Sequence, residues 1–416
     1  MAESTAKTDR RRSPGEGSVY ETTDRSGWRG AVTWTEPDGR RQRRIVSGET
    51  SKLVRAKLDD LRRDLKLGTI APAGKAATVG EYLATWIVRD RARVRPSTWK
   101  GRESHVRVYI IPTLGRLALA RLKPSDVERA IAGWIASGRP VTGEERKRGR
   151  QSHAPVSPLT ARHVRATLRR ALADAVRDGL VGRNAAGDAR PPYVPHRPVT
   201  YLSAPDVRRL LDATAADDYG NVYAVAVSTG LRLGELLGLA WPDVDLPAGP
   251  APDSDHPCTL TVRRSLALAA DGGWTLAQPK SARSRRTIPL PGIARDALKR
   301  ECARQAIART AAGDAWQDRD KLVFTDIVGR ALRPEGVSAT FQKARAAAGL
   351  PHVAFHALRH SAATLMLAEG VPLAVISEWL GHAGIAITAA SYAAVVPALR
   401  HEAAAAMDRA LNGGAS

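Results

Sequence analysis

Two linker-like stretches, the first rich in alanine and the second in proline and arginine, interrupt the apolar pattern of this chain and divide it into three parts. The first is TIAPAGKAA at residues 69–77, and the second is GDARPPYVPHRPVT at residues 187–200, from which we expect a linker over residues 188–200. Proline keeps such a segment extended, so that it can bridge two lobes. A chain of 416 residues that is broken twice in this way is expected to fold around several cores.

The part before the first interruption, residues 17–68, predicts a very small β-β-β-α domain. Its three strand-like runs lie at residues 17–21, 28–34 and 41–48. A helix follows over about 50–67, and the residues spaced to form its apolar face are Leu53, Ala56, Lys57 and Leu61. A small basic sheet can enter a DNA groove, and a support or oligomerisation module is the alternative. Residues 1–16 are polar and basic and are expected to be disordered.

The second part, residues 78–187, predicts a helical domain. Thr78 and Glu81 have the spacing of a capping box, in which each side chain accepts a hydrogen bond from the backbone of the other residue. Ser157 followed by Pro158 is a typical helix start. We therefore expect helices to begin near both of these places.

The last part predicts a mostly α domain over residues 201–400, in which two strand candidates, 259–264 and 286–290, frame a loop. Residues 401–416 belong to an amphipathic tail helix, which can dock on its own domain or on a neighbouring protomer. The expected fold is therefore multidomain and mainly α. A small β-β-β-α domain comes first, a helical domain second, and a mixed, mostly α domain with a small β-sheet last.

The charge balance favours a polyanionic partner. The chain carries 64 lysines and arginines against 42 aspartates and glutamates, a formal net charge of +22. Nucleic acid is the leading candidate, because each neutralised phosphate releases counterions, and a merely solvated basic surface is the alternative. Two cysteines without any Cys/His cluster predict neither a disulfide framework nor a metal site. No apolar run is long enough to span a bilayer, so we expect a cytoplasmic protein.

Two stretches of the last domain place a cation where it can meet a phosphate. Arg232 follows Gly230 at a predicted helix start, and Glu235 lies one turn on, where it can orient the guanidinium or simply form a helix pair. Lys280 lies in a basic loop beside the strand pair, from which a cation can enter the minor groove. Taken singly, the first is an ordinary surface arginine and the second an ordinary solvated loop.

Two later stretches add histidines, a second arginine and a tyrosine. His356 and Arg359 are three residues apart and share a helix face, whereas His360 is rotated away and is expected to be structural. His382 follows the end of another helix, and Tyr392 comes ten residues later. Taken singly, these are an accidental pair and a core tyrosine.

Together and in this order, these stretches resemble the motifs of the tyrosine recombinase (phage integrase) family. The motifs that carry the resemblance are Thr229-Gly230-Leu231-Arg232, Lys280 ahead of Arg286-Thr287-Ile288-Pro289-Leu290, His356-x-x-Arg359-His360-Ser361, Leu380-Gly381-His382 and Tyr392. One departure is Ala357, where the family more often has an acidic residue, and another is the apolar pair Ala389-Ala390 before Ser391. The resemblance covers essentially the whole chain. It implies an arm-type DNA-binding domain at 17–68, a core-binding domain at 78–187 and a catalytic domain at 201–400.

The resemblance implies a site-specific recombinase that cleaves and rejoins DNA through a 3′-phosphotyrosine. Tyr392 is then the nucleophile and His356 its proton acceptor. Arg232, Arg359 and His382 hold the scissile phosphate, and Lys280 protonates the leaving 5′-hydroxyl. Such a reaction needs no metal, ATP or other cofactor. The implied partners are double-stranded DNA attachment sites and three further protomers, in a homotetramer at synapsis.

Three alternatives stay open beside this reading. A type IB topoisomerase uses similar chemistry to relax one duplex, and the arm-like first domain argues against it. A DNA-binding regulator that has lost catalysis is disfavoured because all six expected side chains are present. Within the family, integration of a phage or conjugative element is preferred over a resolution-type reaction because of the arm-like domain. The sequence leaves open whether an excisionase or a host DNA-bending protein takes part.

Overall fold

The computed structural model of the chain comprises two compact units, Met1–Pro195 and His196–Ser416. The residues that the structure describes are 18–22, 27–35, 41–66, 77–141, 145, 147–149, 153–195, 199–246, 258–278, 284–382, 384–385, 389 and 407. Lys280, Tyr392, the predicted basic tail at 1–16 and all of the predicted tail helix at 401–416 except Met407 lie outside them. The first unit holds two separate hydrophobic cores. The finer division into domains stays a prediction.

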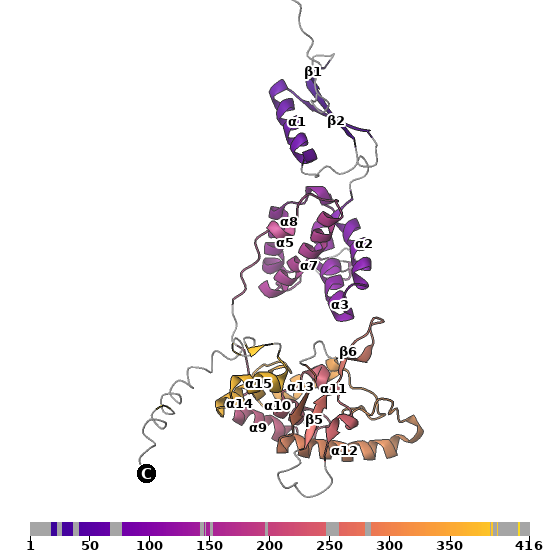
Figure 1. Ribbon diagram of the computed structural model, residues 1–416, viewed down its shortest axis with the longest axis vertical. Helices are drawn as coiled ribbons and strands as arrows, with labels where there is room; N and C mark the ends of the chain where they lie inside the picture. Colours follow the sequence, from indigo (N-terminus) through magenta and orange to yellow (C-terminus); the bar gives the residue numbers. More distant parts are fainter. Residues whose placement is uncertain are drawn as a thin grey trace, which may run out of the picture. The chain divides into compact units, whose positions relative to one another are not determined.

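The first core belongs to a three-stranded sheet and one helix. Strands β1 (Ser18–Glu21), β2 (Trp28–Thr35) and β3 (Arg41–Gly48) form an antiparallel sheet in that order, and helix α1 (Ser51–Lys66) packs on it (Figure 1). The β-β-β-α order that the sequence predicts is therefore confirmed.

The predicted apolar face of α1 is wrong. Val54 and Leu58 are buried with Leu61 beside them, whereas the side chain of Leu53 is exposed. At 100° per residue, positions 54, 58 and 61 fall within an arc of about 60°, a narrower arc than that of the predicted set. Lys57, which the prediction placed in the core, instead donates from Nζ to the carbonyl of Ser47 at 2.8 Å.

The second core belongs to a helical bundle in the same unit. Its elements are α2 (Val79–Arg91), α3 (Pro96–Ser104), the π-helical segment η1 (His105–Ile110), α4 (Ile111–Leu114), the short 3₁₀ turn η2 (Leu119–Arg121), α5 (Pro124–Ser137), α7 (Pro158–Arg177) and α8 (Ala185–Asp188). The predicted capping box is present: Glu81 Oε2 accepts from Thr78 N at 2.8 Å, and Thr78 Oγ1 accepts from Glu81 N at 3.2 Å. Ser157 caps α7 as predicted.

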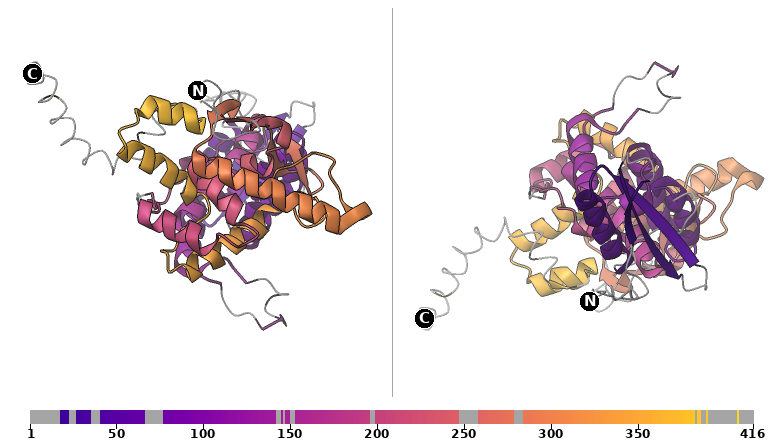
Figure 2. Two further views of the ribbon diagram at one scale, coloured as in Figure 1. Left: turned by 90° about the horizontal axis from the view of Figure 1, so that it is seen from below. Right: turned by 90° about the horizontal axis from the view of Figure 1, so that it is seen from above.

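The second unit is mostly α with two small sheets. Its helices are α9 (Ala204–Ala213), α10 (Gly220–Thr229), α11 (Leu233–Leu237), the 3₁₀ turns η3 (Trp241–Asp243) and η5 (Gly313–Ala315), α12 (Gly292–Ala312), α13 (Pro334–Ala347), α14 (Ala357–Ala368) and α15 (Leu373–Leu380). Tyr223 of α10 meets Phe341 of α13 edge to face at 5.5 Å between ring centroids, and these rings lie in the main core. The long helix α12, drawn orange in Figure 2, packs on α10. The predicted mainly α, multidomain fold class is confirmed.

The sheets of the second unit bring the predicted strands together and add a hairpin that the sequence analysis missed. Strands β4 (Val244–Asp245), β5 (Thr259–Val262) and β8 (Arg286–Pro289) form one antiparallel sheet, and β6 (Ser265–Leu268) pairs with β7 (Trp274–Ala277). Strand β6 lies directly against α11. The contact is so close that a Cβ on Gly234 of α11 would lie 2.6 Å from Ser265 Oγ of β6. The hairpin is therefore seated on the helix that follows Arg232. Among the described helices, none is both long and apolar enough to cross a bilayer.

Candidate active site

The turn between α10 and α11 places Arg232 at a helix N-terminus, as the sequence predicts. Gly230 ends α10 with φ 66°, in the left-handed region that glycine adopts without strain. A Cβ at Gly230 would lie 2.5 Å from Leu380 Cδ2 of α15, so this turn and the end of α15 are in direct contact. Arg232 then stands immediately before α11, with its side chain 38 % exposed.

Replacing Gly230 by alanine is expected to destabilise this unit by about 2–4 kcal/mol, because it adds a left-handed alanine and a clash with Leu380. Gly349 is a matched control, since it has φ 65° and nothing within 4 Å of its would-be Cβ. The free energy of unfolding, measured in urea, should therefore fall further in Gly230→Ala than in Gly349→Ala. Equal losses would contradict the close packing described here.

Glu235 lies between two guanidinium groups. Its Oε1 accepts from Arg232 Nη1 at 2.8 Å, and its Oε2 accepts from Arg286 Nη2 at 3.1 Å. The Glu235 side chain is only 4 % exposed. Burial alone raises the pKa of Glu235, but the charges of Arg286 and Arg232 outweigh it and hold that pKa below its ordinary value. Glu235 therefore contacts Arg232, as the orienting role predicted from the sequence requires, and its carboxylate also contacts Arg286.

Three arginines meet the C-terminal end of α15. The carbonyl of Trp379 accepts from Arg286 Nε at 2.6 Å, that of Leu380 from Arg359 Nη2 at 2.8 Å, and that of Gly381 from Arg232 Nη2 at 3.2 Å. The last carbonyls of a helix lack partners within the helix and carry its negative dipole end, so cations are stabilised there. This arginine cluster, defined as Arg232, Arg286 and Arg359, is thus organised around one helix end.

Arg359 is the most deeply buried member of the arginine cluster. It is 3 % exposed, and its Nη1 donates to the carbonyl of Gly230 at 2.8 Å. Helices α14 and α15 lie side by side in Figure 1, so that Arg359 on the first reaches the end of the second. The guanidinium is therefore held at two backbone points that belong to segments distant in the sequence.

Three histidines surround the arginine cluster. His382 follows α15, and the ring of His356 meets that of His360 edge to face at 4.9 Å between centroids. Burial, followed by the charges of Arg359 and Arg232, lowers the pKa of His382 to about 4. Burial, followed by the neighbouring His356 and Arg359, lowers the pKa of His360 to about 4 as well. Partial desolvation and the same two arginines lower the pKa of His356, so all three rings are neutral at pH 7.

Acid is expected to destabilise the protein through these rings. His360 and His382 titrate near 6.5 in an unfolded chain and near 4 in the folded one, so the unfolded state binds more protons between these values. The stability they contribute is complete above pH 6.5 and is lost as the pH falls towards 4. In His360→Gln, the decrease in unfolding free energy between pH 7 and pH 5 should be smaller than in the wild type. An equal decrease would contradict the lowered pKa of His360.

Four of the six predicted site residues are brought together by the fold. Arg232, Arg359, His356 and His382 come from three separate segments, and the contact between Arg232 and Gly381 spans 149 residues of sequence. Lys280 and Tyr392 lie outside the described residues. Guanidinium groups beside neutral imidazoles offer charge and hydrogen-bond donors to a phosphate anion, together with a neutral ring that can accept a proton.

Arg286 is the residue at this site whose role the sequence analysis missed. It stands in the strand candidate at 286–290 and in the motifs of the resemblance but received no role, although Ile288, two residues further on, is apolar and buried. Alternate residues of a strand face the same side, so this spacing puts Arg286 on the inward side of β8. A charged residue at an inward position of a strand was the available signal.

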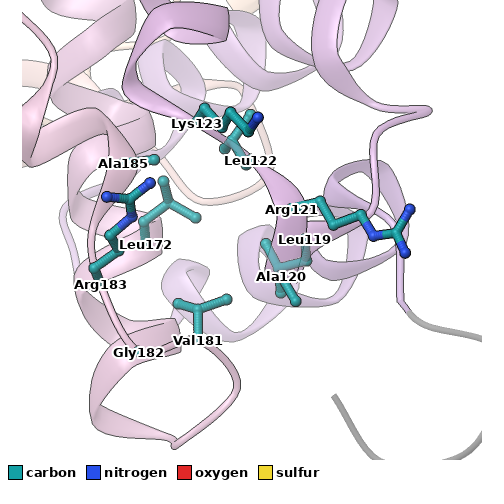
Figure 3. Close-up of a pocket in the computed structure, with 10 residues that line it drawn as sticks. All are labelled: Leu119, Ala120, Arg121, Leu122, Lys123, Leu172, Val181, Gly182, Arg183 and Ala185. Carbon is teal, nitrogen blue, oxygen red and sulfur yellow. The ribbon is translucent and has the colours of Figure 1, made fainter. Parts of the chain in front are cut away.

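One cavity of the first unit carries no candidate chemistry. It measures about 260 Å³, lies in the helical bundle and is lined by apolar side chains such as Leu172 and Val181 together with Arg121, Lys123 and Arg183 (Figure 3). These residues include no histidine, carboxylate or hydroxyl that could transfer a proton or attack a substrate. The candidate active site is the arginine cluster with its histidines, because there the fold brings four of the predicted site residues together.

Comparison with known sequences finds one family over most of the chain. Residues 200–399 match the phage integrase family, and residues 78–135 match the N-terminal SAM-like domain of phage integrases. An integrase of Streptomyces ambofaciens is 30 % identical over 392 residues, which cover 92 % of this chain and 93 % of that protein. A putative prophage phiRv2 integrase of Mycobacterium tuberculosis is 26 % identical, over 84 % of this chain and 85 % of its own.

Solved structures of integrases share the fold. The Tn1549 transposon integrase in complex with transposon right-end DNA matches with a TM-score of 0.60 and 20 % identity, over 76 % of this chain and 94 % of that one. A λ integrase tetramer bound to a Holliday junction matches with a TM-score of 0.53 and 17 % identity, over 90 % of this chain and 94 % of that one. Because the Streptomyces relative matches nearly end to end, the chain belongs to the phage integrase family and is a tyrosine-type site-specific DNA recombinase.

Proposed function

We propose that this recombinase integrates and excises a phage or other mobile element, and that six residues perform the strand cleavage. Arg232 and Arg359 bind the nonbridging oxygens of the scissile phosphate, and His382 donates a further hydrogen bond to it. Tyr392 attacks the phosphorus, His356 accepts its proton, and Lys280 protonates the leaving oxygen. Attack on a phosphodiester adds negative charge to the nonbridging oxygens, and fixed cations aimed at them lower the barrier.

The chemistry balances without an external energy source. The phenolic oxygen of Tyr392 forms a bond to phosphorus while the bond from phosphorus to the 5′ oxygen breaks. One proton passes from the phenol to His356, and another passes from Lys280 to the leaving 5′ oxygen, which departs as a hydroxyl. The 3′-phosphotyrosine keeps the energy of the broken ester, so a 5′-hydroxyl of another strand can attack it and restore the phosphodiester.

The observation that carries this proposal is the convergence of Arg232, Arg359 and His382 at the end of α15. Both arginines contact successive carbonyls there, and His382 follows directly in the chain. The lowered pKa of His356 supports its role, since a neutral ring at pH 7 can accept a proton. The lowered pKa of His382 supports a neutral N–H donor to phosphate rather than a third cation.

The proposed partners are double-stranded attachment sites and three further protomers. The net charge of +22 suits a polyanion, and the λ relative was solved as a tetramer on a Holliday junction. In this proposal residues 17–68 bind arm-type DNA, residues 78–187 bind core DNA and residues 201–400 carry the chemistry. Relatives named as prophage and transposon integrases favour integration over a resolution-type reaction.

A nicked suicide duplex tests the proposal, because loss of the short 5′-hydroxyl fragment traps the covalent intermediate. Wild-type protein should form an adduct, and mass spectrometry of its peptides should find the nucleotide on Tyr392. A parallel assay compares recombination of two marked sites with relaxation of supercoiled DNA. An adduct on another residue, or relaxation without recombination, would refute the proposal.

A further inference from the structure

The second guanidinium beside Glu235, that of Arg286, has no role in the proposed site. We infer that Arg286 is a positioning residue, which acts through Glu235 to orient Arg232 and to leave its positive charge available to the phosphate. The inference rests on the proposed role of Arg232 as a phosphate ligand.

All three nitrogens of the Arg286 guanidinium donate to oxygens of the protein. Its Nε donates to the carbonyl of Trp379, its Nη1 to the carbonyl of Ser284 at 3.0 Å, and its Nη2 to Glu235. Its side chain is 6 % exposed. Since each of its three nitrogens already donates to a protein oxygen, Arg286 is placed to fix other groups and not to bind phosphate.

Arg232, unlike Arg286, is held by the protein on one side and is partly open to solvent. Glu235 accepts hydrogen bonds from both Nη1 and the backbone N–H of Arg232. One carboxylate therefore fixes both the side chain and the backbone of Arg232. The side chain of Arg232 is nevertheless 38 % exposed, which leaves part of its fork open to a ligand.

The charges explain why two arginines are needed. Glu235 and Arg232 alone form a neutral pair, in which the carboxylate competes with a phosphate for the same guanidinium. Arg286 adds a second positive charge on the other carboxylate oxygen, so the three groups together carry a net charge of +1. A transition state that gains negative charge is stabilised by that net charge and not by a neutral pair.

The chain contains a matched network without a link to the site. Arg304 donates to Glu301 at 2.7 Å and to the carbonyl of Thr325 at 3.0 Å, and the side chain of Glu301 is 2 % exposed. Arg304→Gln therefore breaks a buried arginine–glutamate pair and a carbonyl contact, as Arg286→Gln does. Both variants should lose stability, but only Arg286→Gln should slow strand cleavage.

The test is single-turnover cleavage of a suicide duplex at saturating full-length protein. Arg286→Gln should slow cleavage about 10²-fold, in the range of losing one fixed transition-state donor. Arg286→Lys, which keeps the charge, should recover part of that loss, and Arg304→Gln should cleave at the wild-type rate. Equal slowing in the Arg286→Gln and Arg304→Gln variants, or no recovery with lysine, would overturn the inference.

A second substrate separates the electrostatic role from a general loss of structure. A methylphosphonate at the scissile position is neutral, so its transition state gains less from the net charge beside it. The ratio of wild-type to Arg286→Gln rates should therefore shrink on this substrate, whereas a merely structural defect slows both substrates alike.

The Arg232→Gln variant distinguishes failure of this inference from failure of the proposed function. If Arg232→Gln cleaves at the wild-type rate, the proposed phosphate contact is wrong. If Arg232→Gln is slow and Arg286→Gln is not, only the positioning role is wrong. The inference holds if both are slow and if the Arg232→Gln, Arg286→Gln double variant is less than multiplicatively slower, as residues in one network require.

Discussion

Tyr392→Phe is expected to abolish the covalent protein–DNA adduct and to slow strand cleavage by about 10⁴-fold or more, because it removes the nucleophile itself. The substitution removes one oxygen and little volume, so DNA binding and the unfolding transition should be unchanged. A gel-shift titration and a suicide-substrate assay on the same preparation measure both properties.

Another tyrosine of the chain supplies a control. Tyr193, whose side chain is exposed, is a phenol of the same kind that the proposal leaves unused. Tyr193→Phe should form the adduct at the wild-type rate. Adduct formation by Tyr392→Phe would show that another side chain attacks the phosphate, and the proposed chemistry would then need a different nucleophile.

Local structure was predictable wherever short-range chemistry decides it. The capping box at Thr78 and Glu81, the helix start at Ser157 and the helix end at Gly381 all follow from backbone groups within a few residues. The face of α1 was predictable in the same way, because Val54, Leu58 and Leu61 are apolar and lie within a narrow arc of the helix. The predicted set started from Leu53 and included Lys57, and both of these side chains are exposed.

The candidate site was predictable as a set of residue types but not as a geometry. Arg232, Arg359 and His382 were identified from their motifs, whereas the end of α15 as their common support was not. Those contacts join segments that are 21 to 149 residues apart, and no local rule reports them. Arg286 was missed for the same reason, since its partner Glu235 lies 51 residues away.

Arg359→Lys is expected to slow cleavage by about 10³-fold and to lower the free energy of unfolding by about 2–4 kcal/mol. Arg359 holds the carbonyls of Gly230 and Leu380 at 2.8 Å each, and it is 3 % exposed. A lysine ammonium is a compact point charge, so it cannot reach both carbonyls and also present two donors to a phosphate. Each buried carbonyl left without a donor costs about 1–3 kcal/mol, and loss of an aligned donor slows the reaction by about 10²–10³-fold.

Arg345→Lys separates the two effects of this change. Arg345 donates from Nη1 to the carbonyl of Leu350 at 3.2 Å and from Nε to Gln342 at 2.8 Å, and none of these residues belongs to the arginine cluster. It should lose stability in urea but cleave the suicide duplex at the wild-type rate. If Arg359→Lys instead cleaves within about tenfold of the wild type, positive charge alone suffices at this position. Because a lysine has the charge but not the planar fork, that result would mean that the two carbonyl contacts of Arg359 stabilise the fold but are not needed to align the phosphate.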